Sequence, residues 1–164
     1  MQAGTDLGVE VTFQGPDNES AIAQQIEYLD AAIAQKPAAI CFAALDTQAS
    51  LGSIQTAMDA GIPIIGFDSG VPDAPAGAIK ANASTNNLEA GKLAAKETYE
   101  LIKDKIGSAS GTVRIGVVAQ ESNSQSIVER TKGFVEEMTK LIGEDKVSVE
   151  GHDSLKNEKS GAPV

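Results

Sequence analysis

A carboxylate and a hydroxyl follow an apolar run near the middle of the chain. The run Ile62-Pro-Ile-Ile-Gly-Phe67 does not alternate with polar residues, and Asp68 and Ser69 come directly after it. Ligands of open parallel sheets bind at the carboxyl ends of the strands, where a carboxylate can accept hydrogen bonds. The alternative interpretation is that Asp68 is a turn or helix-capping residue before Gly70-Val-Pro72.

The surrounding pattern favours a buried parallel strand for this run. Apolar runs without alternation are typical of strands that helices cover on both faces. Strands are predicted at residues 8–13, 39–45, 63–67, 78–81, 113–119 and 146–150. Helices are predicted between them, around residues 22–36, 51–60, 86–105 and 127–141. This order predicts an α/β fold, a three-layer sandwich around a parallel sheet.

The composition argues against several classes of function. The chain has 23 acidic and 13 basic residues, a formal charge of -10, which disfavours direct binding to DNA or RNA. No apolar run approaches the roughly 20 residues that span a bilayer. Cys41 lies in an apolar run and is expected to be a small buried residue, and His152 stands alone. We therefore expect no metal site.

The familiar sequence motifs of enzymes are also missing. The sequence contains no Gly-x-Gly-x-x-Gly after a strand, no phosphate-binding loop and no Gly-x-Ser-x-Gly. A binding protein needs only hydrogen bonds, a stacking surface and a hinge between two lobes. We expect a binding protein without a cofactor. A flavodoxin-like enzyme or a response-regulator-like domain stays an alternative, because either would show the same alternation of elements.

An internal similarity relates the two ends of the chain. Residues 1–19 and residues 138–158 both read as the end of a helix, a turn, a strand and a loop rich in Asp and Asn. The second copy has a strand and a full helix before it, whereas the first begins partway through its helix. The first strand of the sheet is therefore expected to be missing, which leaves a gap because parallel neighbours need a crossover.

The order of elements and several motifs resemble the type I periplasmic sugar-binding proteins of ABC transporters, of the ribose- and galactose-binding kind. Effector domains of the lactose-repressor family are related to them. The resemblance rests on the segments Leu7-Gly-Val-Glu-Val, Ile40-Cys-Phe-Ala-Ala-Leu-Asp46, Ala60-Gly-Ile-Pro-Ile-Ile-Gly-Phe-Asp-Ser, Asn82-Ala-Ser-Thr-Asn-Asn-Leu-Glu-Ala-Gly91 and Glu129-Arg-Thr-Lys-Gly-Phe134. Together these segments cover nearly the whole chain. Members of the family are about twice as long, so most of the second lobe is expected to be missing as well.

The resemblance implies a set of ligand-binding residues. Asp68 would accept hydrogen bonds from adjacent sugar hydroxyls, and the planar guanidinium of Arg130 would bridge a ring oxygen and a hydroxyl. Ser69 stands where relatives often have Arg or Asn, so ribose need not be the ligand. The predicted set is Asp46, Asp68, Ser69, Ser124, Ser126 and Arg130.

Besides Asp68, three of these residues have a purely structural interpretation. Arg130 could pair with Glu129 or Glu137 on its own helix. Ser124 and Ser126 are suited to capping the helix that follows them.

The resemblance also implies how the chain is divided. Residues 1–107 are expected to form an N-terminal lobe that lacks its first strand, and residues 108–164 the start of a second lobe. Strand 113–119 is the equivalent unit of that second lobe, and it could fill the vacant first-strand position. That movement predicts either one compact flavodoxin-like domain or a domain-swapped dimer.

For the parent protein the resemblance implies a monosaccharide ligand and a membrane permease as partners. It further implies a periplasmic location, or an extracellular one with a lipoprotein anchor. The alternative is the effector-binding domain of a lactose-repressor-type regulator.

Overall fold

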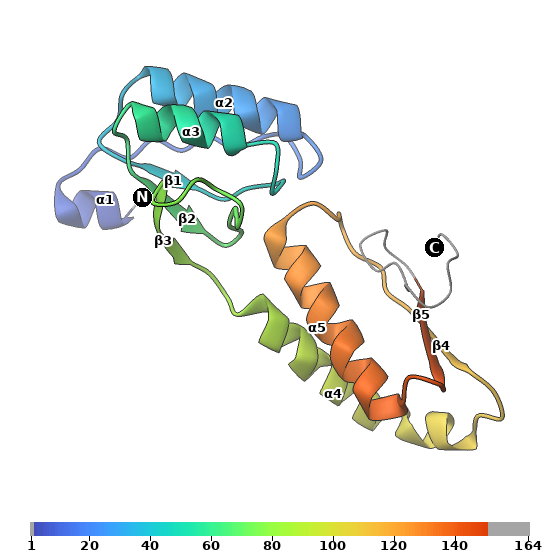
Figure 1. Cartoon of the computed structure of the whole chain (residues 1–164). Coiled ribbons are helices and arrows are strands. Elements are labelled where there is room, and N and C mark those ends of the chain that lie inside the picture. Colours follow the sequence, from blue (N-terminus) through green and yellow to red (C-terminus); the bar gives the residue numbers. More distant parts are fainter. Residues whose placement is uncertain (1, 151–164) are drawn as a thin grey trace.

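The computed structural model describes residues 2–150, which form two units joined at residues 84–86 (Figure 1). The N-terminal unit contains α1 (Gln2–Leu7), α2 (Ile22–Ala34), β1 (Ile40–Phe42), α3 (Leu51–Asp59), β2 (Ile64–Phe67) and β3 (Ile79–Ala83). The C-terminal unit contains α4 (Asn87–Ser108), β4 (Val113–Gly116), α5 (Gln125–Ile142) and β5 (Val147–Glu150).

Both sheets are parallel. In the first sheet the strand order is β1-β2-β3, and Ile64 of β2 pairs with Ile40 on one side and Ile79 on the other. In the second sheet β4 pairs with β5, with Val113 opposite Val147. Helices α2 and α3 lie side by side over one face of the first sheet (Figure 1). The predicted α/β class with parallel strands is confirmed.

The prediction that helices cover both faces of the first sheet is wrong for the described residues. Ile40 and Phe42 of β1 are buried against the helical layer, whereas Cys41 between them is exposed. Strand β2 repeats the pattern, with Ile64 fully buried and Phe67 41% exposed. Successive side chains of a strand point to opposite faces, so one face of this sheet is covered and the other is open. Cys41 is therefore not the buried residue that its apolar neighbours indicated.

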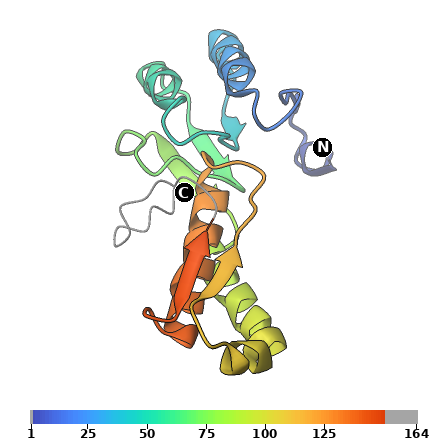
Figure 2. The same cartoon turned by 90° about the vertical axis from the view of Figure 1, so that its right-hand side faces the viewer.

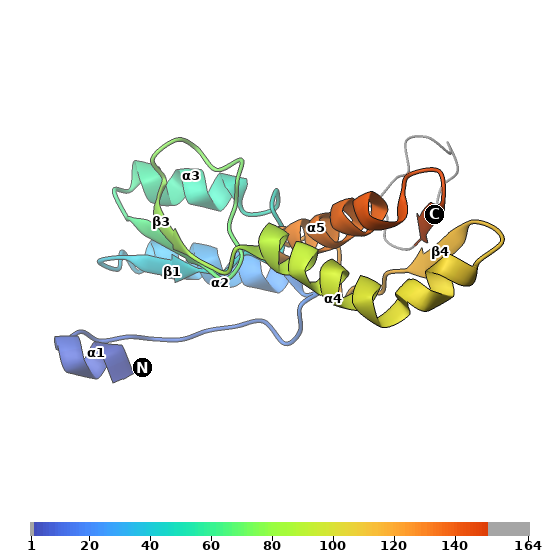
Figure 3. The same cartoon turned by 90° about the horizontal axis from the view of Figure 1, so that it is seen from below.

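The predicted strand at residues 8–13 does not form. The segment is extended but pairs with no strand among the described residues, and Val9 and Phe13 are 56% and 78% exposed. Figure 3 shows α1 and this segment lying apart from the sheet. A strand forms only where a neighbour supplies hydrogen bonds, and the expected gap in the sheet lies between this segment and β1.

Strand β4 does not occupy that gap. It pairs with β5 in a sheet of its own, so within residues 2–150 the predicted movement of residues 113–119 into the first sheet does not occur. Strand β4 obtains its hydrogen bonds from β5 within the parallel β4–α5–β5 unit. It therefore does not need a partner strand in the first sheet.

The hydrophobic contacts divide the described chain into two clusters. The first is built from residues between Leu29 and Ile79, and the second from residues between Ala95 and Val147. Helix α4 supplies Ala95, Tyr99 and Ile106 to the second cluster and packs along α5. The predicted lobe boundary between residues 107 and 108 stays a prediction, but this packing favours a boundary between β3 and α4.

Two glycines allow α4 and α5 to pack with their backbones in contact. A Cβ atom on Gly91 would lie 2.0 Å from the carbonyl oxygen of Arg130, and one on Gly133 would lie 2.0 Å from that of Leu88. Neither distance is compatible with a side chain, so glycine is required at both positions. This crossing fixes the N-terminal half of α5 relative to the start of α4, which follows the linker at residues 84–86.

Candidate ligand-binding site

Asp68 lies at the centre of a tight turn at the carboxyl end of β2. The Ser69 N–H donates to the Phe67 carbonyl at 2.6 Å, and the Asp68 N–H donates to the Ala83 carbonyl of β3 at 3.0 Å. These bonds hold Asp68 at a φ of 55°, a left-handed conformation that costs energy for a residue with a side chain. The turn places an exposed carboxylate at the end of the sheet.

A shallow, open hollow of about 570 Å³ lies beside Asp68. It is lined by Phe67, Asp68, Ala83, Ser84 and Thr85. No hydrogen bond or ion pair involves the Asp68 carboxylate in the described part of the chain. An exposed phenyl ring beside an unpaired carboxylate and two hydroxyls offers a stacking surface and hydrogen-bonding groups to a ligand.

Ser69 faces the C-terminal unit. Its side chain is buried, with 4% exposed, and its Oγ accepts a hydrogen bond from the Ser126 N–H at 3.3 Å. Its carbonyl accepts from the Ala44 N–H at 3.1 Å, which ties β2 to the loop after β1. The structure therefore brings Ser69 and Ser126 together, although 57 positions separate them in the sequence.

Ser124 and Ser126 lie at the start of α5 and are buried. Ser124 is the residue before the first turn, but its side chain caps no backbone N–H. Its Oγ instead contacts the Glu121 carboxylate and lies 3.3 Å from the Ser126 Oγ. The alternative interpretation as a conventional helix cap does not describe Ser124, whose hydroxyl belongs to a small polar cluster beside Ser69.

Arg130 is an exposed residue on the side of α5 that meets α4, just over one turn into the helix. Its Nη2 donates to the Asn87 Oδ1 at 2.6 Å, so it contacts the first residue of α4. Of the two proposed helical partners, Glu129 accepts a hydrogen bond from Gln125, and Glu137 lies 3.6 Å from Lys140 and 3.8 Å from Lys96. The structure thus places the Arg130 guanidinium at the start of α4, beside the linker at residues 84–86.

Asp46 has a structural role in the loop after β1. Its Oδ1 accepts hydrogen bonds from the Gln48 N–H at 2.8 Å and from the Ala49 N–H at 2.7 Å. A carboxylate that accepts two backbone bonds one turn ahead of α3 stabilises that turn. Of the predicted residues, Asp46 therefore has the weakest support as a ligand contact.

Two glutamines near the strand ends were missed by reasoning from the sequence. The Gln25 amide on α2 donates to the Ala43 carbonyl and accepts from the Leu45 N–H, both at 2.9 Å, and so substitutes for a neighbouring strand after β1. The Gln125 Oε1 accepts from the Gly70 N–H at 3.1 Å. A glutamine within an amphipathic helix is typical of a solvated face, so no local signal marks either residue.

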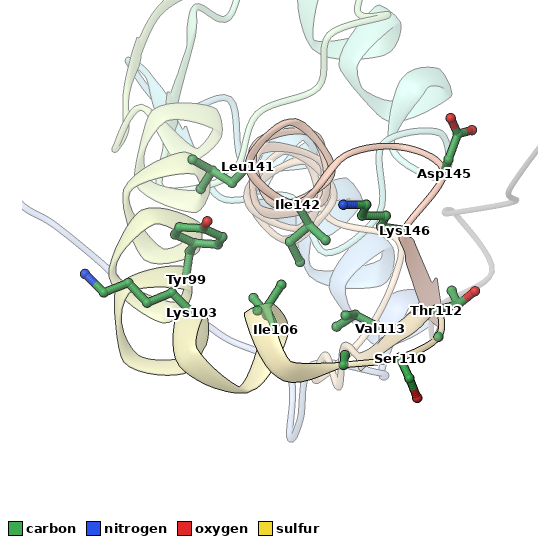
Figure 4. A pocket seen from close by; sticks show the side chains of 13 residues that line it. Tyr99, Lys103, Ile106, Ser110, Thr112, Val113, Leu141, Ile142, Asp145 and Lys146 are labelled. Atoms are coloured by element: carbon green, nitrogen blue, oxygen red, sulfur yellow. The ribbon is translucent and has the colours of Figure 1, made fainter.

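A second hollow, of about 550 Å³, lies at the opposite end of α5 from these residues (Figure 4). Ile106, Val113, Leu141 and Ile142 line its floor, and Lys103 and Lys146 lie near its rim. It contains none of the predicted site residues, and the carboxylate in its lining, Asp145, precedes β5 instead of following the carboxyl end of a strand. We therefore assign the candidate site to the hollow at Asp68.

The remaining charged groups do not form another site. Lys92 beside Glu89 lowers the pKa of that carboxyl, and the same hydrogen bond raises the pKa of Lys92, but both lie on the exposed surface of α4. Within residues 2–150 no group of His, Cys, Asp and Glu side chains is arranged to hold a metal ion. The prediction of no metal site covers His152 too, which lies outside the described residues.

A parallel α/β unit with polar strand ends and a second unit over them defines a class of two-lobed ligand-binding proteins. Comparison with protein families agrees, because the model described as "Periplasmic binding protein domain" matches residues 1–161. The chain belongs to the periplasmic binding protein family. A comparison with curated proteins gave no significant match.

Solved structures support the same family. An "ABC transporter, LacI family transcriptional regulator" from Brachyspira murdochii is 34% identical with a TM-score of 0.76, over 92% of this chain and 49% of that one. A carbohydrate transporter solute-binding protein from Agrobacterium radiobacter, in complex with D-arabinose, is 32% identical with a TM-score of 0.73. The match covers 92% of this chain and 48% of that one.

An ABC transporter solute-binding protein from Agrobacterium vitis, with bound D-fucose, is 28% identical with a TM-score of 0.77. The match covers 93% of this chain and 52% of that one. The chain thus spans about half the length of these relatives. The incomplete type I periplasmic-binding-protein fold that the sequence predicted is confirmed.

Proposed function

We propose that this chain is part of the solute-binding component of an ABC sugar transporter, and that it binds a monosaccharide non-covalently at the hollow beside Asp68. The observation that carries the proposal is the exposed, unpaired Asp68 carboxylate at the carboxyl end of β2, in a chain whose family is that of periplasmic binding proteins. Relatives with bound D-arabinose and D-fucose support a pentose or a hexose as the ligand.

The chemistry of the hollow fits a neutral sugar. A carboxylate accepts two hydrogen bonds from neighbouring hydroxyls, and bonds to a charged acceptor are stronger than neutral ones. Phe67 supplies an exposed ring at the same strand end. Arg130 of α5 is bonded to Asn87, next to the linker at residues 84–86. By leaving Asn87, its guanidinium would contact the ligand from the C-terminal unit. Ser69, Ser124 and Ser126 support the ligand groups by joining the two units behind them.

The test is a thermal-shift and calorimetric screen of the chain against pentoses, hexoses and their derivatives, because a ligand that binds the folded state raises its melting temperature. We expect at least one sugar to raise it. Asp68→Asn should lower the affinity for that sugar by roughly 10- to 100-fold, as expected for the loss of hydrogen bonds to a charged group.

Asp104→Asn is the matched control, since Asp104 is exposed on α4, far along the helix from the hollow. It should bind as the unmodified chain does. An Asp68→Asn variant with unchanged sugar affinity would show that the carboxylate does not hold the ligand. A screen without any shift would remove the support for a sugar.

The location and partners of the whole protein follow from the same proposal. A solute-binding component works outside the cytoplasm and delivers its ligand to a membrane permease, with or without a lipoprotein anchor. Among the described residues no helix is long and apolar enough to cross a membrane.

A second candidate is the effector domain of a lactose-repressor-type regulator, which is favoured by the similarity to the Brachyspira murdochii protein described as a LacI family transcriptional regulator. Both candidates share the sugar site. Binding of the whole protein to an operator DNA rather than to a permease would identify the regulator.

A further inference from the structure

Three hydrogen bonds connect the two units through residues 123–126. The Thr47 N–H donates to the Asn123 carbonyl at 3.2 Å, the Gly70 N–H donates to the Gln125 Oε1 at 3.1 Å, and the Ser126 N–H donates to the Ser69 Oγ at 3.3 Å. Figure 2 shows the loop before α5 beside the N-terminal unit. We call these three bonds the inter-unit contact.

Gln125 is placed to control this contact. Its Nε2 donates to the Glu129 Oε1 at 2.7 Å, one turn further along α5, and this bond orients the amide so that its oxygen faces Gly70. A Cβ atom on Gly70 would lie 2.5 Å from that oxygen, so the two groups are closely fitted. Asn123 and Ser126 contribute backbone atoms, so Gln125 is the member from the C-terminal unit that a side-chain substitution can remove.

We propose that Gln125 is a positioning residue that holds the start of α5 against the Asp68 turn before a ligand arrives. Gly70 is two residues from Asp68, so the bond from its N–H fixes the strained turn and the approach of α5 together. These bonds stabilise without ligand the arrangement of the units in this structure, which we call the closed arrangement. The effect on sugar affinity rests on the proposed function, whereas the effect on the arrangement of the units does not.

The consequence for binding follows from populations. A ligand that binds only the closed arrangement has an apparent Kd that is raised by the reciprocal of the closed fraction. Loss of one hydrogen bond should shift the equilibrium between closed and open arrangements by about fivefold. Removing Gln125 should therefore raise the apparent Kd for a sugar by up to about fivefold, without altering any group that contacts the sugar.

The test measures the distance between the units by double electron–electron resonance. One spin label is placed on the exposed Cys41 in β1, and the other on Leu101→Cys in α4, where Leu101 is 85% exposed. The labelled chain should give one main distance without ligand. Gln125→Ala should increase the population at other distances by about fivefold.

Matched variants separate this role from a general loss of helix stability. Gln55→Ala removes the equivalent bond from the Gln55 Nε2 to the Asp59 Oδ1, 2.8 Å, in α3 and should leave the distances unchanged. Gly70→Ala should act like Gln125→Ala, because its methyl group displaces the Gln125 amide. Gln125→Glu combined with Glu129→Gln exchanges donor and acceptor, keeps an oxygen facing Gly70, and should restore the distances.

The outcomes are distinguishable. A distance distribution of Gln125→Ala that equals that of the unmodified chain overturns the proposal, as does equal disturbance by Gln55→Ala. A change in distances with no sugar bound by any variant supports the inter-unit contact and counts against the proposed function. Sugar binding that is unaffected by Gln125→Ala, despite changed distances, would show that the closed arrangement is not the binding one.

Discussion

At the scale of single residues, the site depends on a backbone conformation that the chain maintains at a cost. Asp68 has a φ of 55° and is held there by the Phe67 carbonyl and by β3. Glycine adopts this conformation without strain, whereas aspartate adopts it more readily than most residues but still at some cost. The turn therefore sacrifices some stability to place a carboxylate in the hollow, which is the pattern expected of a functional position.

A glycine substitution tests this account. Asp68→Gly relieves roughly 1–2 kcal/mol of left-handed strain and loses about 0.5–1 kcal/mol through the freer unfolded chain. We expect the free energy of unfolding to rise by about 0.5 kcal/mol in urea denaturation, while sugar binding is lost. Asp104→Gly in α4 is the control and should lower stability by a few tenths of a kcal/mol. A loss of stability at position 68 as large as at position 104 would contradict the strain argument.

At the scale of elements, the crossing of α4 and α5 positions the site from the C-terminal unit. Gly91 and Gly133 bring the two backbones into contact, and the pair of helices carries Arg130 and the segment that includes Gln125. Met138 and Ala95 are fully buried beside this crossing. Helix packing thus sets the position of α5 within the C-terminal unit, whereas the polar contacts of residues 123–126 join its N-terminus to the N-terminal unit.

Gly133→Ala should disrupt this crossing. Its methyl group would lie 2.0 Å from the Leu88 carbonyl, so the helices must separate, and we expect a loss of about 2–3 kcal/mol in the free energy of unfolding. Gly107→Ala, near the end of α4, meets no atom within 4 Å and should be neutral or stabilising by up to about 1 kcal/mol. Equal effects of the two substitutions in urea denaturation would show that the close approach is not required.

At the scale of the whole molecule, the two small units of residues 2–150 have separate hydrophobic cores, and one sheet face of the N-terminal unit is open among these residues. The clusters around Ile54 and Met138 are separate, and polar bonds connect the units. Helices α2 and α3 cover one face of the sheet of the N-terminal unit (Figure 1), and no other described helix packs on it. The open face carries Cys41 and Phe67.

The open face predicts a reactive thiol. Cys41 is the single cysteine of the chain and is exposed, so it should react with a disulfide reagent in native buffer at a rate close to that of the chain in urea. The rate is measured from the coloured thiol that an aromatic disulfide reagent releases when it reacts with Cys41. Protection of Cys41 until the chain unfolds would mean that this face is covered, by a second copy of the chain or by another segment.

The sequence by itself determined most of the local structure. Apolar runs without alternation gave the parallel strands, helical spacing gave α2, α3, α4 and α5, and the position of Asp68 after a buried run indicated the strand end that carries the candidate site. These features depend on neighbours along the chain, whose preferences are local. The same patterns indicated the family through short motifs around Asp68 and Arg130.

Only the tertiary structure decided which segments found partners. Residues 8–13 have the sequence of a strand but no neighbouring strand, Cys41 has apolar neighbours but faces outward, and residues 113–116 pair with β5 instead of the first sheet. The roles of Gln25 and Gln125 likewise depend on backbone groups far away in the sequence. A strand or a buried polar contact requires a second group, and its presence is a property of the folded chain rather than of the segment.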